Sequence, residues 1–300
     1  MRREFEVLNN IFGYREFRKG QQEVIDKILS GKDVFCILPT GGGKSLCYEI
    51  PAYIFKGTTL VISPLISLMK DQVDNLNSLG INAAYISGGN DFEEVKNIIR
   101  KFIKGEFRLL YVSPERLENR YFLDNIEEAN IAQIVVDEAH CVSMWGHDFR
   151  KSYSKIKPFI CNLKKRPIIT AFTATATETV MKDSIELLGL HNPFIYKGSF
   201  SRDNLEINVL KEVDKLEIIS EIISEHEEES GIIYCSTKNE VEELYKHMLY
   251  RGKSVGKYHG SLKDKEKNYY QEEFLNDNFK VMIATNAFGM GIDKPDVKFI

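Results

Sequence analysis

The chain has 300 residues, 43% of them hydrophobic and 28% charged, which excludes a disordered or fibrous protein. No stretch reaches the roughly 18 consecutive apolar residues of a membrane helix, and no apolar core of a secretory signal follows the charged start. The net charge of −4 excludes a uniformly basic protein that coats DNA. A nucleic acid would therefore have to bind a local basic patch. Five cysteines without a C-x-x-C pair predict neither disulfides nor zinc, and they favour the cytoplasm, with nucleoid association in a bacterium.

Short apolar, β-branched runs alternate with helix-length segments up to about residue 200. Because strands buried on both faces and separated by helices form parallel sheets, this alternation predicts an α/β fold. The predicted strands lie at 34–38, 59–62, 83–86, 109–112, 131–136 and 168–172. Apolar residues three and four positions apart predict helices over 65–79 and 92–103.

A polar, turn-prone stretch at 198–204 interrupts this pattern. It resumes with apolar runs at 207–210, 231–235, 254–258 and 281–284. We therefore predict two domains, 1–200 and 201–300. The chain ends inside an apolar run at 297–300, and a strand left without its partner leaves a sheet unfinished. We expect the second domain to be truncated and the 300 residues to be part of a longer protein.

Residues 38–45 read Leu-Pro-Thr-Gly-Gly-Gly-Lys-Ser and connect a predicted strand to a predicted helix. In that context glycines let backbone N–H groups converge on phosphate oxygens. Lys44 would reach the β- and γ-phosphates, and the Ser45 hydroxyl would bind Mg²⁺. The strict G-x-x-x-x-G-K-[ST] pattern has glycine where Leu38 stands, so a simple glycine-rich turn is the alternative. The predicted phosphate site comprises Thr40, Gly41, Gly42, Gly43, Lys44 and Ser45.

The apolar strand predicted at 131–136 ends in Asp137-Glu138-Ala139-His140. Parallel sheets bind ligands at the C-terminal ends of their strands. We expect Asp137 to hold Mg²⁺ and Glu138 to polarise the attacking water. A helix cap or a surface pair is the alternative, which the phosphate-loop pattern earlier in the chain disfavours.

These two motifs resemble superfamily 2 helicases, and further segments narrow the resemblance to the RecQ family of DNA helicases. The matching segments are 12–21, 63–72, 111–117, 173–176, 231–235, 258–262 and 284–295. The resemblance implies two RecA-like lobes, the second truncated, that use ATP and Mg²⁺ without zinc. It implies a DNA helicase core that travels 3′ to 5′ on single-stranded DNA and unwinds partial duplexes in recombination and repair. The implied catalytic residues are Lys44, Asp137, Glu138 and His140.

The resemblance also assigns binding residues. Tyr14 would stack on adenine, Arg18 would assist and Gln21 would read the adenine edge; Gly291 and Asp293 would complete the nucleotide site. Segment 141–150 holds the single tryptophan and resembles the RecQ aromatic-rich loop, in which each base stacked on an aromatic ring adds about 1–3 kcal/mol. A buried aromatic turn is the alternative. The implied nucleic-acid contacts are Lys70, Arg116, Trp145, His147, Phe149 and Arg150.

Three further expectations stay open. Residues 149–177 hold seven basic and no acidic side chains, which fits DNA and a solvated helix face equally well. In the family, an arginine of a later motif, beyond these residues, stabilises the transition state, so we expect nucleotide binding with slow hydrolysis. The alternatives are an RNA helicase or remodeller, stimulated equally by RNA and DNA, and a nucleotide-gated interaction module with no response to nucleic acid.

Overall fold

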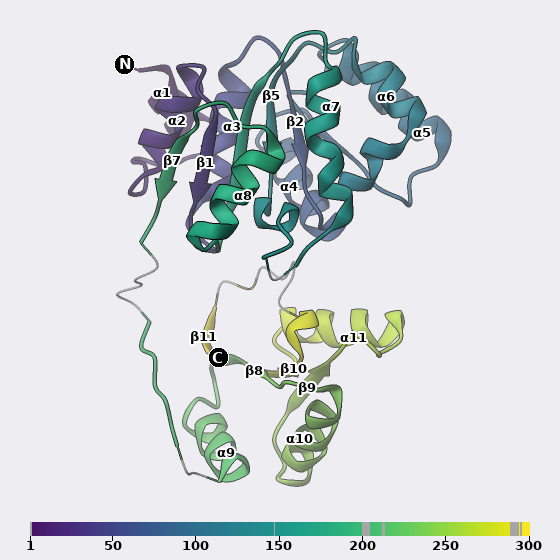
Figure 1. Ribbon diagram of the computed structural model, residues 1–300. Helices are drawn as coiled ribbons and strands as arrows, with labels where there is room; N and C mark the ends of the chain where they lie inside the picture. Colours follow the sequence, from purple (N-terminus) through teal and green to yellow (C-terminus); the bar gives the residue numbers. More distant parts are fainter. Residues whose placement is uncertain (1, 147, 200–204, 212–213, 289–293, 295) are drawn as a thin grey trace. The chain divides into compact units, whose positions relative to one another are not determined.

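The computed structural model describes residues 2–146, 148–199, 205–211, 214–288, 294 and 296–300, so His147, Gly291 and Asp293 lie outside the described residues (Figure 1). By their internal contacts the residues form two compact units, Met1–Asn204 and Leu205–Ile300. Each unit has a parallel sheet with connecting helices, which confirms the predicted α/β class with two parallel-sheet lobes. No helix in the described ranges is long and apolar enough to cross a membrane.

The first unit contains a seven-stranded parallel sheet in the order β3-β4-β2-β5-β6-β1-β7. Its strands are β1 Val34–Ile37, β2 Thr58–Ile62, β3 Ala83–Ile86, β4 Leu109–Val112, β5 Ile131–Val136, β6 Ile168–Thr173 and β7 Phe194–Lys197. The six strands predicted for this unit are all present, within one residue at each end. The prediction missed β7, an edge strand whose four residues alternate between half-buried and exposed, because it lacks the continuous apolar run of an inner strand.

Helices cover both faces of this sheet (Figure 1). Successive side chains of a strand point to opposite faces, so Phe35 packs in one core and its neighbour Cys36 in the other. The helices are α1 Arg3–Asn10, α2 Gln21–Leu29, α3 Lys44–Ile54, α4 Ile66–Ser78, α5 Phe92–Ile103, α6 Arg120–Ile126, α7 Ile156–Asn162 and α8 Glu178–Leu188. Three 3₁₀ turns join them: η1 Pro114–Glu118, η2 Ala139–Val142 and η3 Lys151–Lys155. The helix predicted over 92–103 coincides with α5.

A buried carboxylate connects three segments of this unit. Asp33, just before β1, is 4% exposed. It accepts hydrogen bonds from the Arg166 guanidinium at 2.5 and 3.1 Å. The backbone N–H groups of Ile169 and His191 donate to it at 2.9 and 2.7 Å. Arg166 is therefore a structural residue of the first unit.

We expect Asp33→Ala to lower the free energy of unfolding of the first unit by about 3 kcal/mol, because it removes the carboxylate that pairs with Arg166 and that accepts from the backbone N–H groups of Ile169 and His191. Urea unfolding followed by circular dichroism measures this. Exposed Asp71 offers the control, since Asp71→Ala should change stability by no more than about 0.5 kcal/mol. Equal losses for both variants would contradict the structural role of Asp33.

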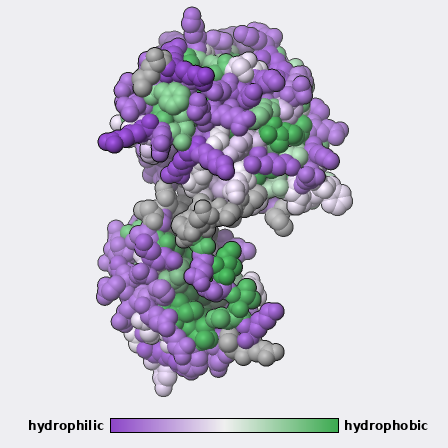
Figure 2. Space-filling model, turned by 90° about the vertical axis from the view of Figure 1, so that its left-hand side faces the viewer, coloured by the Kyte–Doolittle hydropathy of each residue, from purple (hydrophilic) through white to green (hydrophobic). Residues whose placement is uncertain are grey.

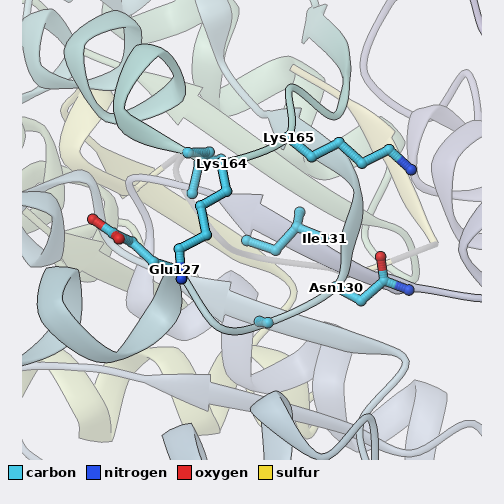
Figure 3. Close-up of a pocket in the computed structure, with 7 residues that line it drawn as sticks. Glu127, Asn130, Ile131, Lys164 and Lys165 are labelled. Carbon is cyan, nitrogen blue, oxygen red and sulfur yellow. The ribbon is translucent and has the colours of Figure 1, made fainter.

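Lys164 and Lys165 lie at the opposite edge of the sheet from Asp137. With Asn130 and Ile131 they line a small cavity of about 60 Å³ at the beginning of β5 (Figure 3), whereas Asp137 follows the end of that strand. The basic side chains of residues 149–177 are thus divided between the two ends of the strands. Neither these lysines nor Arg166 adds to a basic patch near Asp137.

The second unit has a four-stranded parallel sheet in the order β11-β8-β10-β9. Its elements are α9 Lys215–Glu225, β8 Ser230–Tyr234, α10 Lys238–Tyr250, β9 Val255–Tyr258, α11 Asp264–Leu275, β10 Val281–Ala284, the 3₁₀ turn η4 Asn286–Phe288 and β11 Val297–Phe299. The strand predicted at 207–210 is wrong: Ile207 and Val209 are 89% and 74% exposed, and the segment joins neither sheet. Apolar residues in such a run indicate a strand, but a strand also needs a neighbouring strand to which its backbone can hydrogen-bond. Figure 2 shows apolar side chains gathered on one side of this unit.

Candidate active site and nucleic-acid surface

The phosphate loop connects buried β1 to the first turn of α3. Gly41 and Gly43 have φ of 72° and 77°, a left-handed conformation that glycine adopts without strain. At Gly43 a side chain would also collide with the Gln21 amide. Leu38, which departs from the usual pattern, is 4% exposed and packs in the core. The loop therefore keeps its backbone turn while Leu38 contributes to folding.

Arg18 and Gln21 hold this loop in place. Arg18 Nη1 donates to the Gly41 carbonyl at 2.5 Å, and Gln21 Nε2 donates to the Gly43 carbonyl at 3.1 Å. Gln21 Oε1 accepts from the Arg18 backbone N–H at 2.8 Å. Gln21 is 2% exposed whereas Tyr14 is 54% exposed. Each amide atom of Gln21 keeps one further hydrogen-bonding position, and its recognition of adenine stays a prediction.

Lys44, Glu138 and His140 lie together at the C-terminal edge of the sheet. Glu138 has φ 46° and ψ 47°, a left-handed conformation that costs a non-glycine residue about 1–2 kcal/mol. In this conformation its carboxylate lies 3.6 Å from Lys44 Nζ and 3.3 Å from His140 Nδ1. Strain of this kind, maintained by the surrounding structure, is typical of functional sites.

Asp137 is buried beside this cluster. Its carboxylate accepts hydrogen bonds from Ser63 Oγ at 3.3 Å and from the Glu138 N–H at 3.0 Å. Burial, with the neighbouring charge of Glu138, raises the pKa of Asp137 to about 6, although Lys44 acts in the opposite direction. Tyr153 donates to the Asp137 carbonyl at 2.8 Å and fixes the backbone. Two adjacent carboxylates in a partly buried site favour the binding of a cation.

The oxygen donors of this edge fit Mg²⁺, which binds proteins through one or two carboxylates together with waters and phosphate oxygens. Asp137 supplies a carboxylate and Ser45, in the first turn of α3, a hydroxyl. Within the described ranges no group of three or more His, Cys, Asp or Glu side chains is placed to hold a metal ion. A magnesium ion here would therefore depend on Ser45 and on nucleotide oxygens as well as on Asp137.

His140 links the carboxylates to the next strand. Its Nδ1 lies 2.8 Å from Thr173 Oγ1, which in turn donates to the Thr175 carbonyl at 2.9 Å. Thr173 ends β6, and the cap of α8 is instead Thr177, whose side chain accepts from the Val180 N–H. Thr173 therefore connects β6 to His140 and does not cap α8.

The aromatic-rich loop follows η2 and presents its large side chains to solvent. Met144 is 77%, Trp145 75% and Phe149 44% exposed. The alternative of a buried aromatic turn is wrong for Trp145 and Phe149. Cys141 and Ser143 are buried and anchor the beginning of the loop. Exposed aromatic rings on an anchored loop provide stacking surfaces for unpaired bases.

The basic residues assigned to nucleic acid differ in their surroundings. Arg150 donates to the Pro64 carbonyl and to Asp148, both at 3.3 Å, and so ties the aromatic loop to the segment after β2. Arg116 donates to the Ser87 carbonyl at 2.8 Å, and burial lowers its pKa. Lys70 is exposed on α4. Arg150 and Arg116 thus form hydrogen bonds within the protein, whereas Lys70 points to solvent. The nucleic-acid contacts of all three residues stay predictions.

A buried acid that the sequence analysis did not single out is Glu49, which lies four residues after Ser45 in α3. It is 4% exposed, and burial raises its pKa to about 8. A single acid within the apolar stretch of residues 46–52 is the signal that could have revealed it.

Comparisons with known proteins identify the family of this chain. The model of the DEAD/DEAH box helicase family matches residues 18–183, and that of the helicase conserved C-terminal domain matches residues 214–300. The chain belongs to the DEAD/DEAH box helicases. It is 43% identical over 295 residues to the ATP-dependent DNA helicase RecQ of Bacillus subtilis (strain 168) and, over the same length, 43% identical to that of Pasteurella multocida (strain Pm70). Within the DEAD/DEAH box helicases it is of the RecQ type, which confirms the predicted family.

The alignments cover 98% of this chain but 50% and 46% of those two relatives, so the chain spans about half their length. Two solved structures share the fold at 18% sequence identity. The helicase MrfA bound to DNA has a TM-score of 0.73 over 97% of this chain and 42% of its own. S. cerevisiae Dbp5 bound to RNA and ADP BeF3 has a TM-score of 0.72 over 98% of this chain and 76% of its own.

Proposed function

We propose that these residues form the ATP-driven core of a DNA helicase. The observation that carries the proposal is the convergence of Lys44, Glu138 and His140 beside the phosphate loop, at the edge where parallel sheets bind ligands. The RecQ relatives support DNA as the substrate. We infer 3′-to-5′ travel on single-stranded DNA, unwinding of partial duplexes in recombination and repair, and a cytoplasmic location.

Each residue at this edge has a chemical role in the proposal. Thr40, Gly41, Gly42 and Gly43 surround the phosphates, and Lys44 neutralises the β- and γ-phosphates. Ser45 and Asp137 hold Mg²⁺, which when bound supplies positive charge against the charge that develops on the phosphoryl group. Glu138 orients the attacking water. His140 connects Glu138 to Thr173. Tyr14, Arg18 and Gln21 contact adenine.

The ion pair between Lys44 and Glu138 suggests an order of events. The Glu138 carboxylate lies 3.6 Å from the Lys44 ammonium. A γ-phosphate that binds Lys44 competes with Glu138 for the same positive charge. Phosphate binding would thus release the Glu138 carboxylate to accept a hydrogen bond from water.

Binding of ATP tests this function directly. We expect Lys44→Ala to weaken binding of a fluorescent ATP analogue about 100-fold, since hydrogen bonds to charged groups contribute about 1.5–3 kcal/mol each. Exposed Lys56, after the end of α3, offers the control, and Lys56→Ala should bind as the unchanged chain does. Equal affinities for all three chains would contradict the phosphate-loop assignment.

The aromatic loop predicts a separate effect on nucleic acid. We expect Trp145→Ala to weaken binding of single-stranded DNA about 10-fold at fixed salt, because it removes one base-stacking surface, and to leave ATP binding unchanged. Fluorescence anisotropy of a labelled oligonucleotide measures this. Tyr250, 91% exposed in the second unit, supplies the matched aromatic control Tyr250→Ala. Equal affinity of Trp145→Ala and Tyr250→Ala would contradict the role of the loop, and equal binding of an RNA strand would favour the RNA helicase alternative.

We further propose that these 300 residues hydrolyse ATP slowly. Beyond Asn204 the sequence contains one arginine, Arg251. Its guanidinium makes two hydrogen bonds to the Glu217 carboxylate of α9. An arginine already paired in this way is poorly suited to stabilise a γ-phosphoryl group.

A further inference from the structure

A polar cluster of the second unit lies outside the residues assigned above. Glu242, on α10, accepts hydrogen bonds from Lys257 Nζ at 2.8 and 2.9 Å. It also accepts one from His259 Nε2 at 3.0 Å. Lys257, which also lies 5.0 Å from the centre of the Tyr245 ring, and His259 hold the pKa of Glu242 below its ordinary value. One carboxylate thus binds a residue near the end of β9, Lys257, and the residue that follows the strand, His259.

The orientation of His259 depends on this carboxylate. The His259 side chain is 7% exposed. Because a carboxylate only accepts, Nε2 carries the hydrogen of this pair. The other ring nitrogen, Nδ1, is buried and has no hydrogen-bond partner among the described residues. Glu242 is therefore the group that sets the position of the ring.

His259 begins an exposed turn. Its carbonyl accepts from the Leu262 N–H at 3.1 Å, and Leu262 is buried, so both ends of the turn are anchored. Between them Gly260 and Ser261 are exposed, and a side chain at Gly260 would meet nothing within 4 Å. The backbone there is open to a ligand that approaches closely.

This turn lies at the C-terminal edge of the second sheet. It follows β9, and the Thr285 N–H that follows the neighbouring β10 donates to the Tyr258 carbonyl at 3.0 Å. Parallel sheets bind ligands at this edge, and small residues with free backbone N–H groups suit phosphate oxygens.

We propose that Glu242 is a positioning residue for the nucleic-acid strand: through His259 it holds the Gly260–Ser261 turn in the shape that binds one backbone phosphate. This inference rests on the proposed function, since it takes a nucleic acid as the ligand. It assigns a role to Glu242 that does not require the side chain to touch the strand.

The test compares Glu242→Ala with Glu243→Ala, which removes an exposed glutamate from the next position of the same helix. Binding of a single-stranded oligonucleotide is measured by anisotropy at several salt concentrations. For Glu242→Ala we expect about 10-fold weaker binding and a slope of log K against log [salt] shallower by about one, the signature of one lost phosphate contact. Glu243→Ala should bind with the slope of the unchanged chain.

Two further variants separate positioning from general stability. Glu242→Gln keeps an oxygen that accepts from His259 and should restore most of the affinity. Lys257→Met removes the ammonium but leaves the bond between Glu242 and His259, so its slope should equal that of the unchanged chain. ATP affinity should be the same throughout. If Glu242→Ala does not unfold cooperatively, Lys257→Met is the variant that tests the inference. A shallower slope of log K against log [salt] for Lys257→Met would show that DNA binding depends on the charge pair and not on the position of His259.

An unchanged slope in a folded Glu242→Ala chain would overturn the inference. Failure of the unchanged chain itself to bind DNA would count against the proposed function instead. In that event the amide chemical shifts of Gly260 and Ser261 still report positioning: they should move in Glu242→Ala and not in Glu243→Ala, and identical shifts in both would overturn the positioning role.

Discussion

ATP turnover by these 300 residues is expected to be about 10³–10⁵-fold slower than turnover by a polypeptide as long as the RecQ relatives, because that is the effect of an arginine that stabilises the transition-state charge. The described part of the second unit offers Arg251 for this role, and Arg251 is bound to Glu217. Steady-state hydrolysis with saturating single-stranded DNA measures the difference.

Two variants make this comparison decisive. Lys44→Ala in each polypeptide gives the background rate, which rules out a contaminating ATPase. Arg251→Ala should leave the slow rate of the 300 residues unchanged. DNA-stimulated turnover by the 300 residues at the rate of the longer polypeptide would contradict the prediction. If Arg251→Ala then lowered that rate, Arg251 would be the arginine that stabilises the transition state.

Glu49→Gln is expected to stabilise the first unit at pH 8 and to have little effect at pH 5. The pKa of Glu49 is about 8 in the folded chain against an ordinary value of 4.5, so the folded state holds a proton that the unfolded state releases. Stability is therefore lost as pH rises from about 4.5 to 8. At about 1.4 kcal/mol per pH unit the loss between pH 5 and 8 is on the order of 4 kcal/mol. Glutamine does not titrate and avoids it.

Urea unfolding of both chains at pH 5, 6.5 and 8 checks this prediction. Other titrating groups, including Asp137, are present in both chains, so the difference between the two profiles isolates Glu49. Exposed Glu16 offers the control, and Glu16→Gln should follow the profile of the unchanged chain. Parallel profiles for Glu49→Gln and the unchanged chain would show that Glu49 ionises in the fold at its ordinary pKa.

Local sequence patterns predicted most of the first sheet and the residues that converge at its edge. Buried strands such as β1 are continuous apolar runs, and the Gly-Lys-Ser sequence at 43–45 marks the junction of a strand and a helix. Edge elements were harder to predict, because exposure on one side weakens the apolar signal. That is why β7 was not predicted. Residues 207–210 show the opposite error: they have the apolar run of a strand but pair with neither sheet.

The α/β class, the glycine turn before α3 and the place of Asp137 and Glu138 at the end of β5 could all be predicted from the sequence, because each depends on residues that are close together along the chain. Only the packed chain shows which groups meet: Arg166 with Asp33, Arg150 with the Pro64 carbonyl, and Glu242 with His259. It also shows that Gln21 is buried while Trp145 is exposed. Hydrogen bonds and burial between segments far apart in sequence depend on how the chain packs, and local periodicity carries no record of that packing.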